Sequence, residues 1–352
     1  MRNKGFITLR TVVCLGTAAL LGTLVPGNAL CAISNRIGVM QINAAEIQPK
    51  ATQHMIQEDY VITPGIRYVT MKEQNTIKQG AGLEYADIGL LQKDQVAIVT
   101  GKSSNGWLQI YYIGTIGYIQ EELTQTYLGH VRPKEAWRLD LTQTEIRMNV
   151  LGDSISYGDK LSSVEQSYAA LLGKQLHAVS NLNYGLNGSS LAGIHTDRLL
   201  DRYPAMDRNA NLILVCGGTN DYGCLGEEGY GTELGRMGDV SDATFYGGLN
   251  QLMCGLRQMY PNGEIVFMTP PQRRICVKKN QFGYVLSDYV RAIQEMATFY
   301  GIRVINLNGA PELDFAGAKA KYLVDGLHPN KTGHSMIANY IYQELQKYSR
   351  GE

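Results

Sequence analysis

Residues 147–156 read Arg-Met-Asn-Val-Leu-Gly-Asp-Ser-Ile-Ser, a mostly apolar run that ends in glycine, aspartate and serine. The run has the length and composition of a buried β-strand over Arg147–Leu151. Since α/β sheets bind ligands beyond the carboxyl ends of their strands, Ser154 lies where chemistry is expected. Its hydroxyl becomes a good nucleophile only when a base takes the proton. Taken alone, an Asp-Ser pair after a strand is more often a helix cap or a turn.

Strand-like and helical stretches alternate from Ile146 to the end of the chain. The strand-like runs are Arg147–Leu151, Ala178–Leu182, Asn211–Cys216, Glu264–Thr269 and Arg303–Asn306. The helical stretches are Val164–Leu176, Ala243–Met259, Val285–Tyr300 and Lys331–Tyr348. This alternation predicts an α/β domain over residues 146–352, with a parallel sheet and helices on both faces.

A base for Ser154 is available in the turn-rich loop before the last helix. Asp325 and His328 lie three residues apart there. This spacing lets the carboxylate accept a hydrogen bond from one ring nitrogen while the other nitrogen faces a serine. The alternative is a surface loop in which His328 is simply solvated, and for this pair alone that alternative is favoured.

Donors for an oxyanion follow the second and third predicted strands. Gly188 has no side chain, so its backbone N–H can approach a ligand closely. Asn220 can point its amide into the same space, and losing one such donor costs about 10²–10³ in rate. The alternatives are a glycine-bearing loop and a capping asparagine.

Four blocks of this domain occur in the order, and roughly the spacing, of one enzyme family. They read Gly152-Asp153-Ser154-Ile155, Asn183-x-Gly185-x-x-Gly188, Gly217-Gly218-Thr219-Asn220-Asp221 and Asp325-Gly326-Leu327-His328-Pro329-Asn330. The domain resembles the SGNH, or GDSL-type, hydrolases. Ile155 stands where the family's short name has leucine, a swap of similar volume. The sequence holds no Gly-x-Ser-x-Gly, which argues against the elbow of α/β-hydrolases.

The resemblance implies a flavodoxin-like three-layer α/β/α fold and a serine esterase without a metal or a cofactor. It implies Ser154 as nucleophile, His328 as base and Asp325 as the group that orients the histidine. The Gly188 N–H, the Asn220 side chain and the Ser154 N–H would form the oxyanion hole.

Residues 62–128 have a different character, with short strand-like runs separated by turns. The runs are Gly65–Met71, Gln95–Thr100, Trp107–Ile113 and Ile116–Ile119, and they predict a small β-barrel. Asn105–Ile110 and Gly114–Ile119 make this segment resemble a bacterial SH3-like domain, which implies binding to peptidoglycan and attachment to the cell wall. The alternative is a spacer that binds nothing. Residues 32–61 and 129–145 are interpreted as linkers.

The first 31 residues have the order of a secretory signal peptide. Arg2, Lys4 and Arg10 precede an uncharged apolar stretch over Thr11–Val25, and small residues follow Pro26-Gly27. The stretch is short for a membrane span of about 20 residues, so we expect export rather than a stable membrane span. An uncleaved anchor is the alternative. Four cysteines lie beyond residue 31, namely Cys216, Cys224, Cys254 and Cys276. Export permits disulfides between them, and buried thiols are an equal alternative.

The formal charge is zero, from 32 basic and 32 acidic side chains, which argues against a nucleic-acid partner. Removing the three cations of the predicted signal leaves 29 basic and 32 acidic side chains, a net charge of −3. The chain without the predicted signal is therefore expected to be slightly acidic.

A glycine-rich insert over Tyr222–Val240 follows Asn220 and is expected beside the site, where it either shapes the substrate pocket or forms an ordinary surface excursion. Tyr222, Tyr230 and Tyr246 are candidates for stacking on sugar rings.

Taken together, these features of the sequence predict a secreted, wall-associated serine esterase that removes short acyl groups, above all acetyl, from a carbohydrate or peptidoglycan. The alternatives are a lysophospholipase-like lipid esterase and a wall-binding protein with an inactive hydrolase domain.

Overall fold

The structure is a computed structural model that describes residues 60–129, 137–142, 144–195, 197–223 and 231–351. The predicted signal peptide over residues 1–31 and nearly all of the predicted linker over 32–61 lie outside the described residues. By its contacts, Glu58–Glu352 forms one compact unit.

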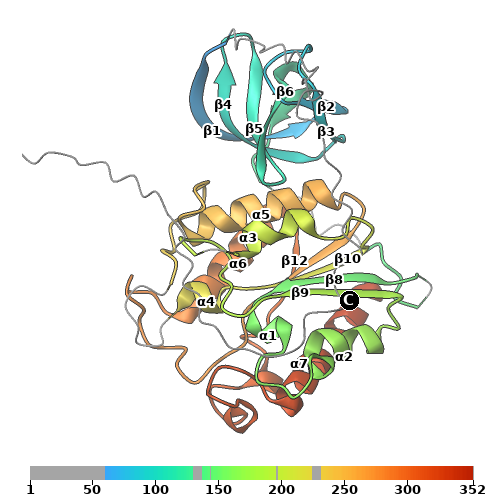
Figure 1. Cartoon of the computed structure of the whole chain (residues 1–352), viewed down its shortest axis with the longest axis vertical. Coiled ribbons are helices and arrows are strands. Elements are labelled where there is room, and N and C mark those ends of the chain that lie inside the picture. The colour runs from blue at the N-terminus through green and yellow to red at the C-terminus, as the bar shows by residue number, and fades with distance from the viewer. Residues whose placement is uncertain (1–59, 130–136, 143, 196, 224–230, 352) are drawn as a thin grey trace, which may run out of the picture. The chain divides into compact units, whose positions relative to one another are not determined.

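A five-stranded parallel sheet forms the centre of the C-terminal part (Figure 1), with strand order β12-β11-β10-β8-β9. Its strands are β8 (Arg147–Gly152), β9 (Ser180–Gly185), β10 (Leu212–Cys216), β11 (Glu264–Met268) and β12 (Arg303–Ile305). Numbered along the chain, the order is 2-1-3-4-5, as in flavodoxin-like folds, and it reverses between β8 and β10. The predicted parallel α/β domain is confirmed, and the reversal marks the place where ligands bind in such sheets.

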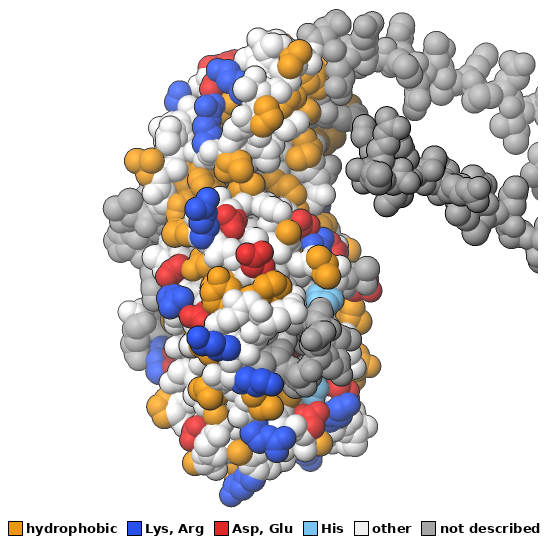
Figure 2. All heavy atoms as spheres, turned by 90° about the vertical axis from the view of Figure 1, so that its left-hand side faces the viewer, with side chains coloured by type: hydrophobic (Ala, Val, Ile, Leu, Met, Phe, Trp, Pro, Cys, Tyr) orange, Lys and Arg blue, Asp and Glu red, His pale blue; other side chains and the backbone are white. Residues whose placement is uncertain are grey.

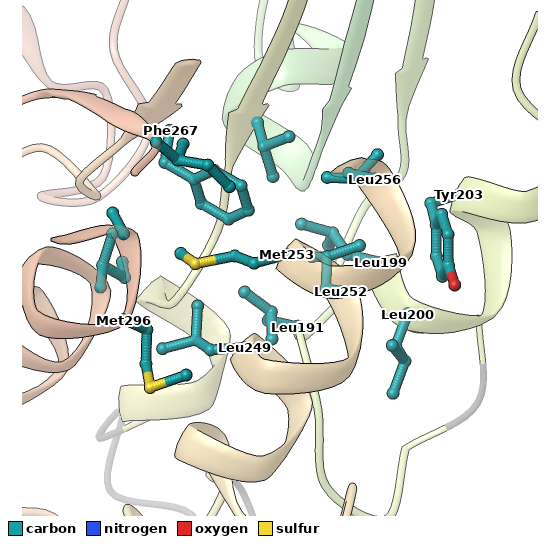
Figure 3. Close-up of a cluster of buried hydrophobic side chains, with 14 of the residues drawn as sticks. Leu191, Leu199, Leu200, Tyr203, Leu249, Leu252, Met253, Leu256, Phe267 and Met296 are labelled. Atoms are coloured by element: carbon teal, nitrogen blue, oxygen red, sulfur yellow. The ribbon is translucent and has the colours of Figure 1, made fainter. Parts of the chain in front are cut away.

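Helices cover both faces of this sheet because its central strands are apolar on both sides. Val150, Leu212 and Leu214 belong to one buried cluster, and Leu151, Ile213 and Val215 belong to the other. The first cluster includes side chains of α2 (Tyr168–Gln175) and α7 (Lys331–Ser349), and the second those of α3 (Leu199–Arg202), α5 (Phe245–Met259) and α6 (Leu286–Tyr300). Figure 3 shows Leu249, Met253 and Met296 of the second cluster pointing toward one another from α5 and α6.

Short helical segments lie between the strands and longer helices of both parts of the chain. They are α1 (Ser154–Tyr157), α4 (Thr219–Tyr222), η1 (Glu121–Leu123), η2 (Val164–Gln166), η3 (Tyr203–Ala205), η4 (Pro311–Leu313) and η5 (Ala320–Tyr322). The predicted helix over residues 164–176 is in fact η2 followed by α2. Ser167 separates the two because its hydroxyl caps α2, accepting the N–H of Ala170 at 3.2 Å.

The second strand is found later in the chain than predicted. The sequence predicts Ala178–Leu182, but β9 continues to Gly185, which pairs with Gly152. β9 is an edge strand, so it needs few apolar residues. Its polar Asn181 and Asn183 interrupt the apolar run from which a strand is predicted.

The N-terminal part is a seven-stranded antiparallel sheet with strand order β3-β2-β6-β5-β4-β1-β7. Its strands are β1 (Ile62–Met71), β2 (Asn75–Lys78), β3 (Asp87–Leu91), β4 (Val96–Ser103), β5 (Trp107–Tyr112), β6 (Thr115–Gln120) and β7 (Thr124–Thr126). The sheet has a core of its own, which includes Ile77, Val99 and Ile110. These features are consistent with a small barrel-like domain. The sequence did not predict β2, β3 and β7, which are only three to five residues long.

Side chains of α5 donate hydrogen bonds to the antiparallel sheet. Asn250 Nδ2 donates to the Tyr68 hydroxyl at 2.6 Å, and Gln258 Nε2 donates to the Val96 carbonyl at 3.1 Å. Asn250 is fully buried, so its amide needs such partners.

On the face shown in Figure 2, basic and acidic side chains are interspersed, in keeping with the balanced composition. Among the described residues, no helix combines the length and the apolarity that crossing a bilayer requires. Cys216, Cys254 and Cys276 are free thiols, the first two buried, while Cys224 lies outside the described residues. The buried-thiol alternative therefore holds at Cys216 and Cys254, while the Cys276 thiol is free but only partly buried.

His334 in α7 makes folding stability depend on pH. It is fully buried, accepts the Tyr168 N–H at Nδ1 at 3.1 Å, and burial lowers its pKa from 6.5 to about 4. Between these values the unfolded chain binds a proton that the folded chain excludes, so the His334 contribution is complete above pH 6.5 and falls by about 3 kcal/mol toward pH 4.

Two buried acids act in the opposite direction over part of this range, because burial raises the pKa of Asp153 and Asp221 from 3.8 to about 6. The His334 effect is therefore measured as a difference between two proteins. From pH 7 to pH 4, the unfolding free energy of the native protein should fall by about 3 kcal/mol more than that of His334→Asn. Urea unfolding at both pH values tests this expectation, and identical pH dependence in the two proteins would contradict it.

Candidate active site

The candidate nucleophile begins a helix at the carboxyl end of β8. Ser154 is the first residue of α1, and Asp153 caps the helix by accepting the Ile155 N–H at 2.9 Å. Both side chains are buried. As a first-turn residue, Ser154 has a backbone N–H that no carbonyl inside the helix accepts. The local sequence thus presents a hydroxyl and a free N–H at the same end of the strand.

Three predicted residues meet in a chain of hydrogen bonds. Ser154 Oγ is 2.9 Å from His328 Nε2, and His328 Nδ1 is 2.8 Å from Asp325 Oδ2. The other carboxylate oxygen, Asp325 Oδ1, accepts the backbone N–H groups of Leu327 at 3.0 Å and of His328 at 2.8 Å. The loop that precedes α7 therefore fixes the carboxylate against the ring.

The charge of Asp325 decides which ring nitrogen carries the proton. Desolvation opposes ionisation, but the hydrogen bonds from His328 and Leu327 outweigh it and lower the pKa of Asp325 to about 2. At neutral pH the carboxylate accepts hydrogen bonds and donates none, so Nδ1 holds the proton. His328 Nε2 is then the acceptor for the Ser154 hydroxyl, which is the arrangement that a general base requires.

The two predicted oxyanion donors follow the carboxyl ends of β9 and β10. Gly188 has a φ of +73°, a conformation that favours glycine, and no atom lies within 4 Å of where a Cβ would stand. Among the described residues, no acceptor takes the Gly188 N–H. Asn220 lies in α4 at the end of β10, and its Nδ2 donates one hydrogen bond to the Ser189 carbonyl at 2.8 Å. The second amide hydrogen of Asn220 remains for another acceptor.

Asp221 anchors the loop that carries Gly188. This fully buried carboxylate accepts the N–H of Leu191 at 2.7 Å and the N–H of Ala192 at 3.0 Å. Burial raises its pKa to about 6, although these hydrogen bonds oppose the rise. Asn220 and Asp221 thus bind consecutive parts of one loop from a single turn of helix.

Arg202 connects the same loop to the ends of two strands. Its Nη2 donates to the Gly152 carbonyl at 2.9 Å and to Ser189 Oγ at 2.8 Å. Its Nη1 donates to the Tyr184 carbonyl, and its Nε donates to the Asp197 carbonyl at 3.0 Å. A planar guanidinium holds several acceptors in one fixed geometry, which an ammonium group cannot do.

We expect Arg202→Gln to lower kcat by about 10–100-fold with little change in KM, because small displacements of donors and nucleophile slow the chemical step. Arg202→Lys keeps the charge but loses the planar fork, so it should recover only part of the rate. Steady-state kinetics test both variants. The exposed Arg236 supplies the control, and loss of the same size in Arg236→Gln would contradict the expectation.

Two of the three tyrosines proposed from the sequence for stacking on a sugar are not available for that role. Tyr222 is fully buried, with Arg273 4.5 Å from its ring centre, and Tyr246 is only 6% exposed. Both rings fill the core, so stacking by Tyr222 and Tyr246 was a wrong expectation, while Tyr230 lies outside the described residues. Among the described residues, no group of three or more His, Cys, Asp or Glu side chains is placed to hold a metal ion.

Sequence reasoning assigned no role to Arg202, Ser189 or Asp159. Asp159 Oδ2 is 3.7 Å from His328 Nε2. Asp159 lies five residues after Ser154, and this nearness in sequence was the available signal. Arg202 gave no signal, because it contacts backbone carbonyls and the Ser189 hydroxyl.

The parallel α/β fold and this group of side chains define an ester hydrolase. The chain belongs to the GDSL-like lipase/acylhydrolase family, whose model matches residues 150–336. A solved protein from Lactobacillus plantarum is 33% identical, with a TM-score of 0.52, and the match covers 58% of this chain and 98% of that protein. A family two carbohydrate esterase from Clostridium thermocellum, solved in complex with cellohexaose, is 15% identical with a TM-score of 0.40 over 83% of this chain and 91% of that one. No curated protein matches the chain.

Proposed function

We propose that the chain is a serine esterase that removes short acyl groups, above all acetyl, from a carbohydrate or peptidoglycan. Ser154 attacks the ester carbonyl while His328 takes its proton, and Asp325 holds the imidazolium. The N–H groups of Gly188 and Ser154 and the amide of Asn220 stabilise the oxyanion. His328 then gives its proton to the leaving alcohol, and water releases the acyl group in a second step.

One observation carries the proposal: Ser154, His328 and Asp325 form a continuous hydrogen-bonded chain with contacts of 2.9 Å and 2.8 Å. A serine hydroxyl needs such a base, and the base needs an orienting carboxylate. The free N–H of Gly188 lies on the loop that Asn220 binds. Nucleophile, base and donors are thus present together, which argues against an inactive hydrolase domain.

The carbohydrate or peptidoglycan part of the proposal rests on the rest of the chain. The antiparallel sheet over residues 62–126 carries the stretches that resemble a bacterial SH3-like domain, and such domains are compatible with wall binding. The N-terminal 31 residues resemble a secretory signal, so we propose that the enzyme is exported and stays at the cell wall.

Hydrolysis of nitrophenyl esters of increasing chain length tests the activity. We expect the highest kcat/KM for acetate and a steady fall toward long chains. A preference for long chains would instead support the lipid-esterase alternative. Absence of activity on every ester would support the wall-binding alternative.

Sedimentation of the full chain with purified cell wall tests the proposed location. We expect the protein to pellet with the wall and to stay in solution without it. A protein that remains in solution in both samples would leave the antiparallel sheet as a spacer and would not affect the esterase proposal.

A further inference from the structure

A second carboxylate lies beside the ring nitrogen that faces the candidate nucleophile. Asp159 Oδ2 is 3.7 Å from His328 Nε2, the same atom that is 2.9 Å from Ser154 Oγ. The same carboxylate oxygen pairs with Lys160 Nζ at 3.3 Å, and 24% of the Asp159 side chain is exposed. The carboxylate is therefore held at the site and still open to a ligand.

The backbone fixes Asp159 in this place independently of its side chain. Gly158 ends α1 with a φ of +94°, where a Cβ would come within 2.9 Å of Ser167. The Asp159 N–H then donates to the Ser154 carbonyl at 2.9 Å. A substitution of Asp159 keeps this backbone hydrogen bond, so the contribution of the carboxylate can be tested separately from the fold.

The position matters because of where the leaving alcohol must lie. In acyl transfer by a serine, the imidazolium donates its Nε2 proton to the leaving oxygen. That oxygen therefore comes within hydrogen-bond reach of His328 Nε2, next to Asp159 Oδ2. A carboxylate accepts hydrogen bonds and donates none. An alcohol with a second hydroxyl beside the ester oxygen supplies the matching donor, whereas a simple alkyl or aryl alcohol does not.

We propose that Asp159 is a specificity-determining residue that selects esters of polyols, by accepting a hydrogen bond from a hydroxyl adjacent to the esterified oxygen. Vicinal hydroxyls of this kind are what a partly acylated carbohydrate presents. The inference rests on the proposed function, because it names the alcohol part of the ester that Ser154 would cleave. A site with a polar group that needs a partner discriminates strongly against analogues that lack the partner.

Three acetate esters separate this role from a general effect on the reaction. Ethylene glycol monoacetate has the adjacent hydroxyl, its O-methyl ether keeps the oxygen but replaces the donor hydrogen by a methyl group, and nitrophenyl acetate reports the chemistry alone. We expect Asp159→Ala to lower kcat/KM for the glycol ester by about 10–100-fold, the range of a hydrogen bond to a charged group. The other two esters should keep their native values, and Asp159→Asn, which retains a neutral acceptor, should lie between.

The other possible results of these assays contradict either the specificity role of Asp159 or the proposed esterase activity. Equal losses on all three esters would mean that Asp159 acts on the imidazolium, and no loss on any ester would mean that it does not contact the alcohol. Both results overturn the specificity role while leaving the esterase intact. A native enzyme that does not cleave nitrophenyl acetate would instead overturn the proposed function. The control is Glu165→Gln, an acidic residue that pairs with Lys174, and we expect it to leave all three rates unchanged.

Discussion

Replacing Ser154 by alanine is expected to lower kcat for nitrophenyl acetate by about 10⁴–10⁶-fold, since removing the nucleophile removes the covalent route altogether. The hydroxyl lies 2.9 Å from His328 Nε2, so the variant loses one hydroxyl group and this one hydrogen bond. Residual activity above the rate in water would come from the oxyanion donors and from substrate binding.

Ser156 provides a matched control from the same helix. It is also buried, but its hydroxyl is 2.6 Å from the Tyr168 hydroxyl and not in contact with His328. Ser156→Ala should cost about 1 kcal/mol of stability while keeping kcat near the native value. Burst kinetics and melting temperatures of both variants separate the two effects. Equal rates in the native enzyme and Ser154→Ala would reject Ser154 as the nucleophile.

The fold was predictable where burial on both faces leaves a continuous apolar run. β8, β10 and β11 lie inside the sheet, and their predicted limits agree with the structure to within one residue. The predicted limits of β9 lie two to three residues too early in the chain, because an edge strand tolerates Asn181 and Asn183. The short strands of the antiparallel sheet gave no pattern long enough to detect.

The site was predictable only where its residues follow a strand or form a recognisable block. Ser154, His328 and Asp325 were expected together, and the structure brings them together. Arg202 was missed because most of its partners are backbone carbonyls, 50 residues away in the case of Gly152. Every residue carries the same backbone carbonyl, so the sequence does not show which carbonyls a side chain will contact. Such a contact can be identified only when the fold is known.

Asn220→Ala is expected to lower kcat by about 10²–10³-fold, the cost of removing one donor to the oxyanion. KM should change little, because the interaction strengthens when negative charge develops on the carbonyl oxygen. Asn220 Nδ2 donates one hydrogen bond to the Ser189 carbonyl at 2.8 Å. This bond orients the amide, and it leaves the second amide hydrogen for the substrate.

The same bond raises a competing explanation, in which Asn220 merely holds the loop that carries Gly188. A boronic acid that forms a tetrahedral adduct with Ser154 distinguishes the two roles. If the amide binds the oxyanion, boronic acid affinity falls by the same factor as kcat/KM, because both reflect the tetrahedral state. If Asn220 only holds the loop, KM rises and the melting temperature falls together. Asn209→Ala, at an exposed turn, is the control and should change none of these quantities.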